Sequence, residues 1–468
     1  MKRLQSRALV LAIGAGYLGI CALFTPPRPP PPASQTSVAS IAAALPAGFL
    51  LGTATSAHQI EGGTDRNDWA EFEAQSGRIA RGERSGNATD HWNRVTEDVD
   101  LMKQLGANAY RFSLEWSRVE PIPGQWDEAA WRHYRDEVER LGEAGIVPMV
   151  TLLHFTLPNW LAKAGGLRAP EFPDAFARFA GEVAARLGDK IDLYCTINEP
   201  NVVMYNGYVR GIFAPGEKSN SAAVQAHAGM LRAHAAATRA VRARRPTARI
   251  GLAINLIAFE PKRWWNLLDV VVARFAADAF NWAFLDSVTA GRIRFRAPGF
   301  PKLDEALPTL VGSLDFVGVN YYRRDILSFA PSEPGFVRDE PGPGPRTDLG
   351  WEIYPQGLVT VLREVQRRCR LPIYITENGL ADDSGKRRGA FIRDHLRAVA
   401  DAVREGIDIR GYFHWSLLDN FEWADGFEPR FGLFRVDYAT FARTKAPGAE
   451  VFAEFAQALR DRGQAHPP

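Results

Sequence analysis

The chain has 468 residues, 46% of them hydrophobic and 11% aromatic, which is enough for either one large α/β barrel or two ordinary domains. It contains 56 basic and 54 acidic residues, so the net charge of +2 gives no reason to expect a nucleic-acid partner. Its three cysteines show neither metal-ligand spacing nor a disulfide framework, and we expect neither a metal nor a cofactor.

The first 45 residues differ in composition from the rest of the chain. A basic flank at residues 1–7 precedes an apolar run at 8–24, and a proline-rich linker follows at 25–45. This order is typical of export or membrane anchoring, although the run is at the short edge of what spans a bilayer. We therefore expect an exported protein. It is membrane-anchored on the extracytoplasmic side if the run stays as a signal-anchor, and secreted or periplasmic if the run is cleaved as a signal peptide.

Residues 46–462 alternate β-prone apolar runs with amphipathic stretches of helical period, and residues 463–468 form a tail. Strands that alternate with helices predict a parallel sheet. Eight such units in this length predict a single-domain α/β fold, a (β/α)8 TIM barrel with long loops. The candidate strands are residues 49–53, 109–112, 147–154, 193–198, 250–254, 316–320, 373–376 and 412–415. The candidate helices are residues 97–105, 128–144, 173–187, 222–245, 354–370 and 389–405.

Two glutamates each end a short apolar strand. Glu199 ends the sequence Leu-Tyr-Cys-Thr-Ile-Asn-Glu, and Glu377 ends Ile-Tyr-Ile-Thr-Glu. The carboxyl ends of the strands form the active-site face of a parallel barrel, and two carboxylates that face one sugar are enough to break a glycosidic bond. Other strands also end in polar or aromatic residues. Because a buried charge must be desolvated and then paired, their gathering on one face indicates a site. These residues are Gln59, Arg111, His154, Asn198, Asn320, Tyr322 and Trp415.

In these segments the chain resembles glycoside hydrolase family 1, the β-glucosidase family. Thr-Ile-Asn-Glu-Pro at 196–200 and Ile-Thr-Glu-Asn-Gly at 375–379 are together highly specific, and further matching segments run in family order over nearly all of 47–459. The resemblance implies an O-glycoside hydrolase, a retaining and exo-acting β-glycosidase for unphosphorylated glucosides, galactosides or fucosides. Its substrate would be a small-molecule glycoside or a glycolipid.

The resemblance also implies individual roles. Glu377 would attack the anomeric carbon, and Glu199 would act first as acid and then as base. Arg111, Asn198 and Tyr322 would complete the catalytic set. Physical reasoning agrees, since Arg111 could pair with Glu377 and keep it ionised, and a negative Glu377 should raise the pKa of Glu199. The carboxylate of Glu422 would repel a sugar 6-phosphate. The groups that hold the sugar would be Gln59, His154, Asn198, Trp415, Glu422, Trp423 and Phe431.

Two other functions use the same residues or the same fold. One is a retaining transglycosylase with a glycolipid or sugar acceptor in place of water. The other is a non-catalytic, membrane-tethered sugar-binding protein, although such proteins typically lose one catalytic carboxylate.

Where the family usually has Trp, Tyr and Trp, this chain has Leu51, His58 and Phe155. In this it resembles a subgroup that includes archaeal β-glycosidases and membrane-anchored plant enzymes that transfer galactose between galactolipids.

A second segment bears on membrane association. Residues 263–275 place Trp264 and Trp265 beside Arg263 and an apolar helical stretch. This composition suits a membrane interface, and it equally suits a helix packed under a rim loop. No signal in the sequence sets an oligomeric state.

Overall fold

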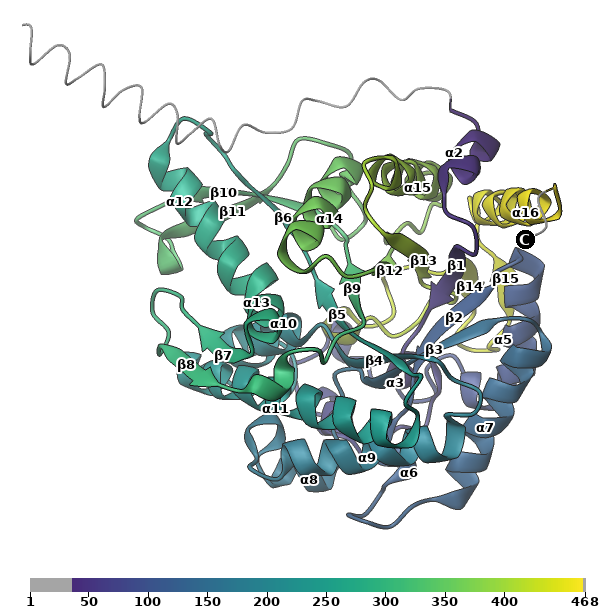
Figure 1. Cartoon of the computed structure of the whole chain (residues 1–468), viewed down its shortest axis with the longest axis horizontal. Coiled ribbons are helices and arrows are strands. Elements are labelled where there is room, and N and C mark those ends of the chain that lie inside the picture. Colours follow the sequence, from purple (N-terminus) through teal and green to yellow (C-terminus); the bar gives the residue numbers. More distant parts are fainter. Residues whose placement is uncertain (1–35, 466–468) are drawn as a thin grey trace, which may run out of the picture.

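In the computed structural model, which describes residues 36–465, eight parallel strands close into a barrel with helices around it (Figure 1). Around the barrel the order is β1-β13-β12-β9-β5-β4-β3-β2, so each strand lies beside the next barrel strand along the chain. This confirms the predicted (β/α)8 barrel. The barrel strands are β1 (Leu50–Ala54), β2 (Ala109–Ser113), β3 (Val147–Leu153), β4 (Leu193–Asn198), β5 (Arg249–Asn255), β9 (Phe316–Asn320), β12 (Ile373–Asn378) and β13 (Ile409–Trp415).

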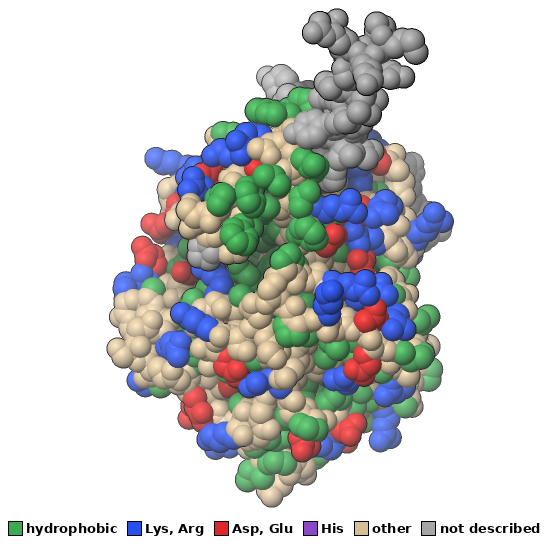
Figure 2. All heavy atoms as spheres, turned by 90° about the vertical axis from the view of Figure 1, so that its left-hand side faces the viewer, with side chains coloured by type: hydrophobic (Ala, Val, Ile, Leu, Met, Phe, Trp, Pro, Cys, Tyr) green, Lys and Arg blue, Asp and Glu red, His purple; other side chains and the backbone are tan. Residues whose placement is uncertain are grey.

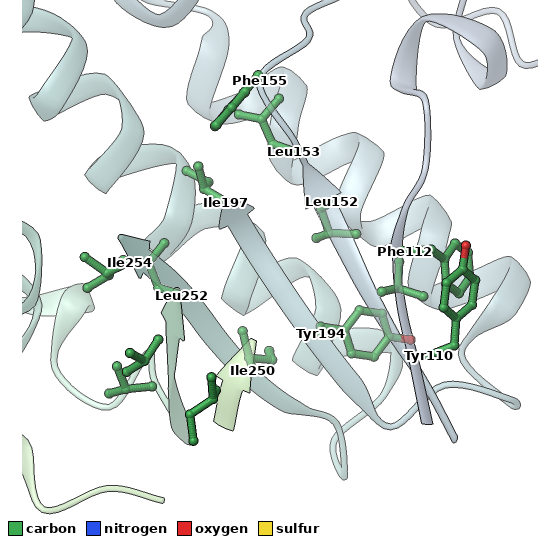
Figure 3. Packing of buried hydrophobic residues seen from close by; sticks show 14 of the residues in the cluster. Tyr110, Phe112, Leu152, Leu153, Phe155, Tyr194, Ile197, Ile250, Leu252 and Ile254 are labelled. Carbon is green, nitrogen blue, oxygen red and sulfur yellow. The ribbon is translucent and has the colours of Figure 1, made fainter. Parts of the chain in front are cut away.

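Side chains along each strand alternate between the barrel interior and the surrounding helices, as the pleat requires. On β2, Ala109 and Arg111 point inward, whereas Tyr110 and Phe112 pack outward in the large core between strands and helices. Figure 3 shows part of this outward layer on β2, β3, β4 and β5. The interior is filled by a second, smaller cluster. It includes Ala54, Ala109, Met149, Cys195, Ala253, Phe316, Tyr374, Phe413 and Trp415.

Strands β4 and β12 break this alternation just before their carboxyl ends. The register of β4 against β5 shifts between Cys195 and Asn198, and that of β12 against β9 shifts between Ile375 and Glu377. Such an irregularity turns the side chains that follow it toward the other face of the strand. Because Cys195 and Tyr374 point inward, a regular strand would send Asn198 and Glu377 outward. The two shifts therefore turn both residues into the barrel mouth.

All six predicted helices are present, with ends within a few residues of the prediction except at the start of α5. The apolar helical stretch within residues 263–275 is helix α12, and several other helices were not predicted, among them α13 and α16. The α-helices are α2 (Val38–Ala44), α3 (Ala57–Ile60), α4 (Asp68–Glu73), α5 (His91–Leu105), α6 (Trp116–Val119), α7 (Glu128–Glu143), α8 (Asn159–Lys163), α9 (Phe172–Leu187), α10 (Pro200–Val202), α11 (Asn220–Arg244), α12 (Leu267–Ala276), α13 (Ala283–Ala290), α14 (Pro355–Cys369), α15 (Arg388–Arg404) and α16 (Glu450–Ala465). Short 3-10 helices are η1 (Ala80–Gly82), η2 (Gly166–Arg168), η5 (Pro308–Leu310), η6 (Pro334–Phe336) and η7 (Trp423–Asp425), and π-helices are η3 (Val203–Arg210) and η4 (Ala277–Trp282).

Three small sheets decorate the barrel. The largest has the order β11-β10-β6 and carries helix α12, which packs on β10 and β6. Its strand β6 follows directly after barrel strand β5, and β10 follows directly after β9, so this sheet stands on the loops at the carboxyl ends of the barrel strands. The strands are β6 (Ala258–Pro261), β10 (Arg324–Phe329), β11 (Val337–Pro341), β7 (Arg292–Phe295), β8 (Leu303–Ala306), β14 (Phe434–Val436) and β15 (Arg443–Lys445).

The end of the predicted linker at 25–45 is folded. Helix α2 lies inside this range, with Ile41 and Leu45 only 1% exposed, and it packs on α15 and α16. Burial of these apolar side chains outweighs the linker-like composition before them. At the other end, α16 runs past residue 462 into the predicted tail. The basic flank and the apolar run at 8–24 lie outside the described residues. Within residues 36–465, no helix has both the length and the apolar character needed to cross a bilayer.

Candidate active site

The barrel brings both strand-ending glutamates to one mouth. Glu377 lies on β12, and Glu199 follows β4 directly. Glu199 is 6% exposed and Glu377 is 3% exposed, so each carboxyl group is largely removed from water. Such buried carboxyls need partners, because an isolated charge costs several kcal/mol to bury. Their partners come from the ends of the neighbouring strands.

Glu377 has one partner for each carboxylate oxygen. Arg111 Nη1 donates to Oε1 at 2.5 Å, and the Tyr322 hydroxyl donates to Oε2 at 2.6 Å. Burial raises the pKa of Glu377 above its ordinary value, while the Arg111 cation and the Tyr322 hydrogen bond oppose the rise. The predicted Arg111–Glu377 pair is present, and Tyr322 joins it as the second partner of Glu377. Since Glu377 has the cation of the site as its direct partner, it is the carboxyl that ionises first.

Glu199 accepts two hydrogen bonds on the same oxygen. Asn255 Nδ2 donates to Oε1 at 2.9 Å, and Asn320 Nδ2 donates to it at 2.8 Å. Burial and the negative charge of Glu377 raise the pKa of Glu199 to about 8, against these two hydrogen bonds and Arg111. A proton on Glu199 therefore belongs on Oε2, the oxygen that neither amide contacts. Glu199 is thus mostly protonated near neutral pH, whereas its cationic partner Arg111 favours the ionised form of Glu377.

A short chain of hydrogen bonds joins the two carboxyl groups. Asn198 Oδ1 accepts from Arg111 Nη2 at 2.7 Å and from Asn320 Nδ2 at 3.1 Å. Thr376 Oγ1 donates to Asn320 Oδ1 at 2.6 Å and so fixes the orientation of the Asn320 amide. This amide also lowers the pKa of Glu377 through a hydrogen bond. One side-chain amide therefore reaches both carboxyl groups, which places them on the two sides of a narrow gap.

Two polar atoms of the predicted sugar-holding residues are buried and have no hydrogen-bond partner in the described part of the chain. They are His154 Nδ1 and Glu422 Oε2. The His154 ring is held by a 3.0 Å contact between its Nε2 and Asn198 Nδ2, and it stacks with Trp415 at a centroid distance of 5.9 Å. Buried polar groups are normally paired. These two atoms are therefore available to a ligand with hydroxyl groups.

The other predicted sugar-holding residues are also at the mouth. Gln59 Nε2 donates to Asn420 Oδ1 at 2.9 Å and to the Phe421 carbonyl at 2.8 Å, so its donors tie α3, which follows β1, to the loop after β13. Trp423 stacks with His154 at 6.1 Å, and Phe431 lies edge-on to Tyr322 at 6.3 Å. Burial, and then Asp425, raise the pKa of Glu422 to about 8.

The unusual residues His58 and Phe155 lie behind Trp423. The His58 ring stacks on Trp423 at 5.7 Å with an interplanar angle of 10°, and Phe155 packs against it at 4.9 Å. Phe155 has a positive φ of 71°. Neither residue has a hydrogen bond to Glu199 or Glu377 among the described residues. They therefore set the position of Trp423 rather than that of the carboxyls.

Asn255 is the partner that sequence reasoning missed. It is the last residue of β5, one position beyond the predicted strand. The rule that found the other residues, a polar side chain at the carboxyl end of a barrel strand, would have found Asn255 as well. Asn201 holds it in place, because Asn201 Nδ2 donates to the Asn255 carbonyl at 2.7 Å.

Comparison with known proteins places this geometry in a family. The family model described as Glycosyl hydrolase family 1 matches residues 41–460. β-Glucosidase A of Thermotoga maritima is 35% identical over 422 residues, which cover 85% of this chain and 94% of that protein. A β-glucosidase of an Agrobacterium species is 36% identical over 437 residues, which cover 88% of this chain and 95% of that protein.

Solved structures agree with the sequence comparison. The Thermotoga maritima β-glucosidase in complex with glucoimidazole superposes with a TM-score of 0.83 and 32% identity, over 89% of this chain and 99% of that chain. The same organism's family 1 glycoside hydrolase with a cyclophellitol analogue, a transition state mimic, superposes with a TM-score of 0.84.

The pH dependence of activity tests the role of Asn255. Replacing Asn255 with Ala removes a hydrogen bond that stabilises the Glu199 carboxylate, so the pKa of Glu199 should rise by on the order of one unit. A reaction that needs the Glu199 proton then persists to higher pH. We expect the alkaline limb of kcat/KM for a nitrophenyl β-glucoside, near pH 8 in the parent protein, to move upward. The matched control is Asn281→Ala, because Asn281 bonds only the backbone of Ile257. A limb that stays in place or moves down would contradict this role.

Proposed function

The chain belongs to glycosyl hydrolase family 1, and from this membership we infer that it is a retaining, exo-acting β-glycosidase. It hydrolyses unphosphorylated β-glycosides by double displacement. The observation that carries this function is the buried pair Glu199 and Glu377, which share the Asn320 amide and of which Glu377 alone pairs directly with Arg111. A retaining enzyme needs one ionised carboxylate for attack and one protonated carboxyl for the leaving group, with the two groups about 5–5.5 Å apart.

In the first step Glu377 acts as the nucleophile. Arg111 and Tyr322 each hold one of its oxygens, so the carboxylate is oriented before the sugar arrives. Glu377 attacks the anomeric carbon and forms a glycosyl-enzyme. At the same time Glu199 gives its proton to the glycosidic oxygen, and the pKa of about 8 keeps that proton in place at neutral pH.

In the second step Glu199 acts as a base. Once Glu377 is esterified, its negative charge is gone, and a main cause of the raised pKa of Glu199 disappears with it. Glu199 can then take a proton from the incoming water, which releases the sugar with its original anomeric configuration. One carboxyl thus serves as acid and as base because its neighbour changes charge during the reaction.

The charges at the mouth support an unphosphorylated sugar. The largest effects of charged groups on the pKa of Glu422 come from the carboxyl groups of Asp425, Glu377 and Glu199. A sugar phosphate placed beside Glu422 would therefore add its negative charge to a cluster of carboxyl groups. The reason differs from the predicted one, since burial leaves Glu422 itself mostly protonated near neutral pH. Its free Oε2 and His154 Nδ1 instead suit the hydroxyl groups of a neutral sugar.

Replacing the nucleophile gives the sharpest test of the roles. We predict that Glu377→Ala loses turnover by a factor of at least about 10⁴ on a nitrophenyl β-glucoside. Added azide should restore part of the activity, because a small anion fits where the carboxylate was removed, and the product should be the inverted glycosyl azide. If the glycosyl azide from this variant had the retained configuration, Glu377 would be the acid/base and Glu199 the nucleophile.

Replacing the acid should separate substrates by their leaving groups. We expect Glu199→Ala to spare a dinitrophenyl β-glucoside far more than an alkyl β-glucoside, because only the poor leaving group needs the proton. Azide should here intercept the glycosyl-enzyme and give the retained glycosyl azide. Equal losses on both substrates would refute Glu199 as the acid.

We also propose that the protein is exported. The support is the basic flank followed by the apolar run at residues 8–24. If the run persists as a signal-anchor, the barrel stands outside the cytoplasm on a membrane, and if it is cleaved, the barrel is released. Carbonate extraction of membranes from cells that express the full chain, together with N-terminal sequencing, separates these outcomes. Activity found only in the cytosol, with an intact N-terminus, would rule out export.

A further inference from the structure

Exposed apolar side chains gather on one helix of this protein. Of eleven large hydrophobic residues that are exposed in the described chain, six lie between Trp264 and Phe275, on α12 and in the turn before it. Figure 2 shows green side chains gathered in the upper half of this face of the molecule. Scattered exposed hydrophobics are normal, but a contiguous group marks an interaction surface. We define the α12 face as Trp264, Leu268, Val271 and Phe275, which are 38%, 50%, 37% and 49% exposed.

The helix is fixed with this face outward. Its opposite side buries Asp269, Val270 and Ala273. The Asp269 carboxylate is not exposed, and it accepts hydrogen bonds from Arg263 Nε at 2.7 Å and from the Phe329 backbone N–H on β10 at 3.0 Å. Turning the α12 face inward would bring this paired carboxylate to the surface. The composition of residues 263–275 equally suits a helix packed under a rim loop. Only the side that carries Asp269, Val270 and Ala273 is packed in this way.

The α12 face stands on the same side of the barrel as the catalytic pair. Strand β6, on which α12 packs, begins three residues after Asn255, and β10 begins two residues after Tyr322. Both residues are partners of the catalytic carboxyls. A partner that covers the α12 face therefore lies beside the mouth through which a glycoside enters.

Charges near this helix are already paired. Lys262 pairs with Glu340 at 2.6 Å, Arg263 with Asp269 at 2.7 Å, and Arg274 with Asp278 at 3.8 Å. The surface therefore offers apolar area and indole rings without an excess of charge of either sign. Trp264 and Trp265 pack edge-on at 6.0 Å and mark one end of the helix. An amphipathic helix with Trp at its edge is suited to the boundary between lipid headgroups and acyl chains.

We propose that the α12 face docks on the surface of a lipid bilayer. The choice of a bilayer rests on the export proposed above, with the apolar run at residues 8–24 kept as an anchor. Residues 25–37, between the apolar run and α2, span at most roughly 45 Å when extended, so an anchored barrel stays close to its membrane. In Figure 1, α2 and α12 both lie toward the upper edge of the molecule. A barrel held near its N-terminus can therefore rest this edge on the same membrane, with the active-site mouth beside the surface.

Vesicle binding tests the proposal without the N-terminal run. The family model matches residues 41–460, and the alignments cover 94% of the Thermotoga maritima relative and 95% of the Agrobacterium relative, so a chain that begins at residue 36 keeps the whole family unit and should fold alone. We expect this shortened protein to co-sediment with phosphatidylcholine vesicles. Because the nearby charges are paired, phosphatidylglycerol should change the bound fraction less than two-fold. The double variant Leu268→Ser/Phe275→Ser should lower the bound fraction by about five-fold or more.

A matched control uses equally exposed apolar residues elsewhere. Val311 and Ile122 are 64% and 52% exposed, and Val311→Ser/Ile122→Ser should bind vesicles like the parent. Activity on a soluble nitrophenyl β-glucoside, measured on every variant, separates a failure of the proposed catalytic function from a failure of docking. No binding by the parent, or equal binding by the Leu268/Phe275 variant, would overturn the proposal. The proposal would also be overturned if the parent did not bind vesicles but formed a dimer in solution through this face. Such a dimer would be shown if the Leu268→Ser/Phe275→Ser variant were monomeric.

Discussion

The ion pair between Arg111 and Glu377 is the contact on which the site depends. The Arg111 side chain is fully buried and that of Glu377 is only 4% exposed, so an unpaired charge at this depth would cost several kcal/mol. Arg111 also holds Asn198, which in turn accepts from Asn320 and contacts His154. Groups from four barrel strands, and His154 just after a fifth, are therefore oriented from one guanidinium. The Arg111 cation favours ionisation of Glu377, and the negative charge of Glu377 then favours the protonated form of Glu199. Double displacement requires this difference between the two carboxyl groups.

The strand irregularities decide which residues can join this network. On the regular alternation of β12 and β4, Glu377 and Asn198 would face the surrounding helices, where neither would meet Arg111. The register shift near the carboxyl end of each strand turns these residues inward, next to the site. Irregularities of this kind weaken local ladder pairing. In this protein the weakened pairing is in β12, which carries Glu377, and in β4, which Glu199 follows directly.

The barrel and most of the site could be predicted because their signals are local. Alternating strand and helix patterns predict eight parallel units, and polar residues at strand ends predict Arg111, His154, Asn198 and both glutamates. Other features depend on contacts between distant segments. Helix α2 follows a proline-rich stretch and is held by α15 and α16. The exposure of the α12 face depends on Asp269 meeting β10. The mostly protonated state of Glu422 follows from burial among other carboxyls. No sequence period encodes these contacts.

The backbone at Glu199 adopts the left-handed conformation, with φ 42° and ψ 55°. A residue with a Cβ atom gives up about 1–2 kcal/mol in this region, where glycine would lose almost nothing. The stability of the fold alone therefore does not explain a glutamate at this position. The turn after β4 keeps a glutamate at a position where glycine would be more stable. The strain is offset in function, because Glu199 at this position can deliver its proton to the glycosidic oxygen.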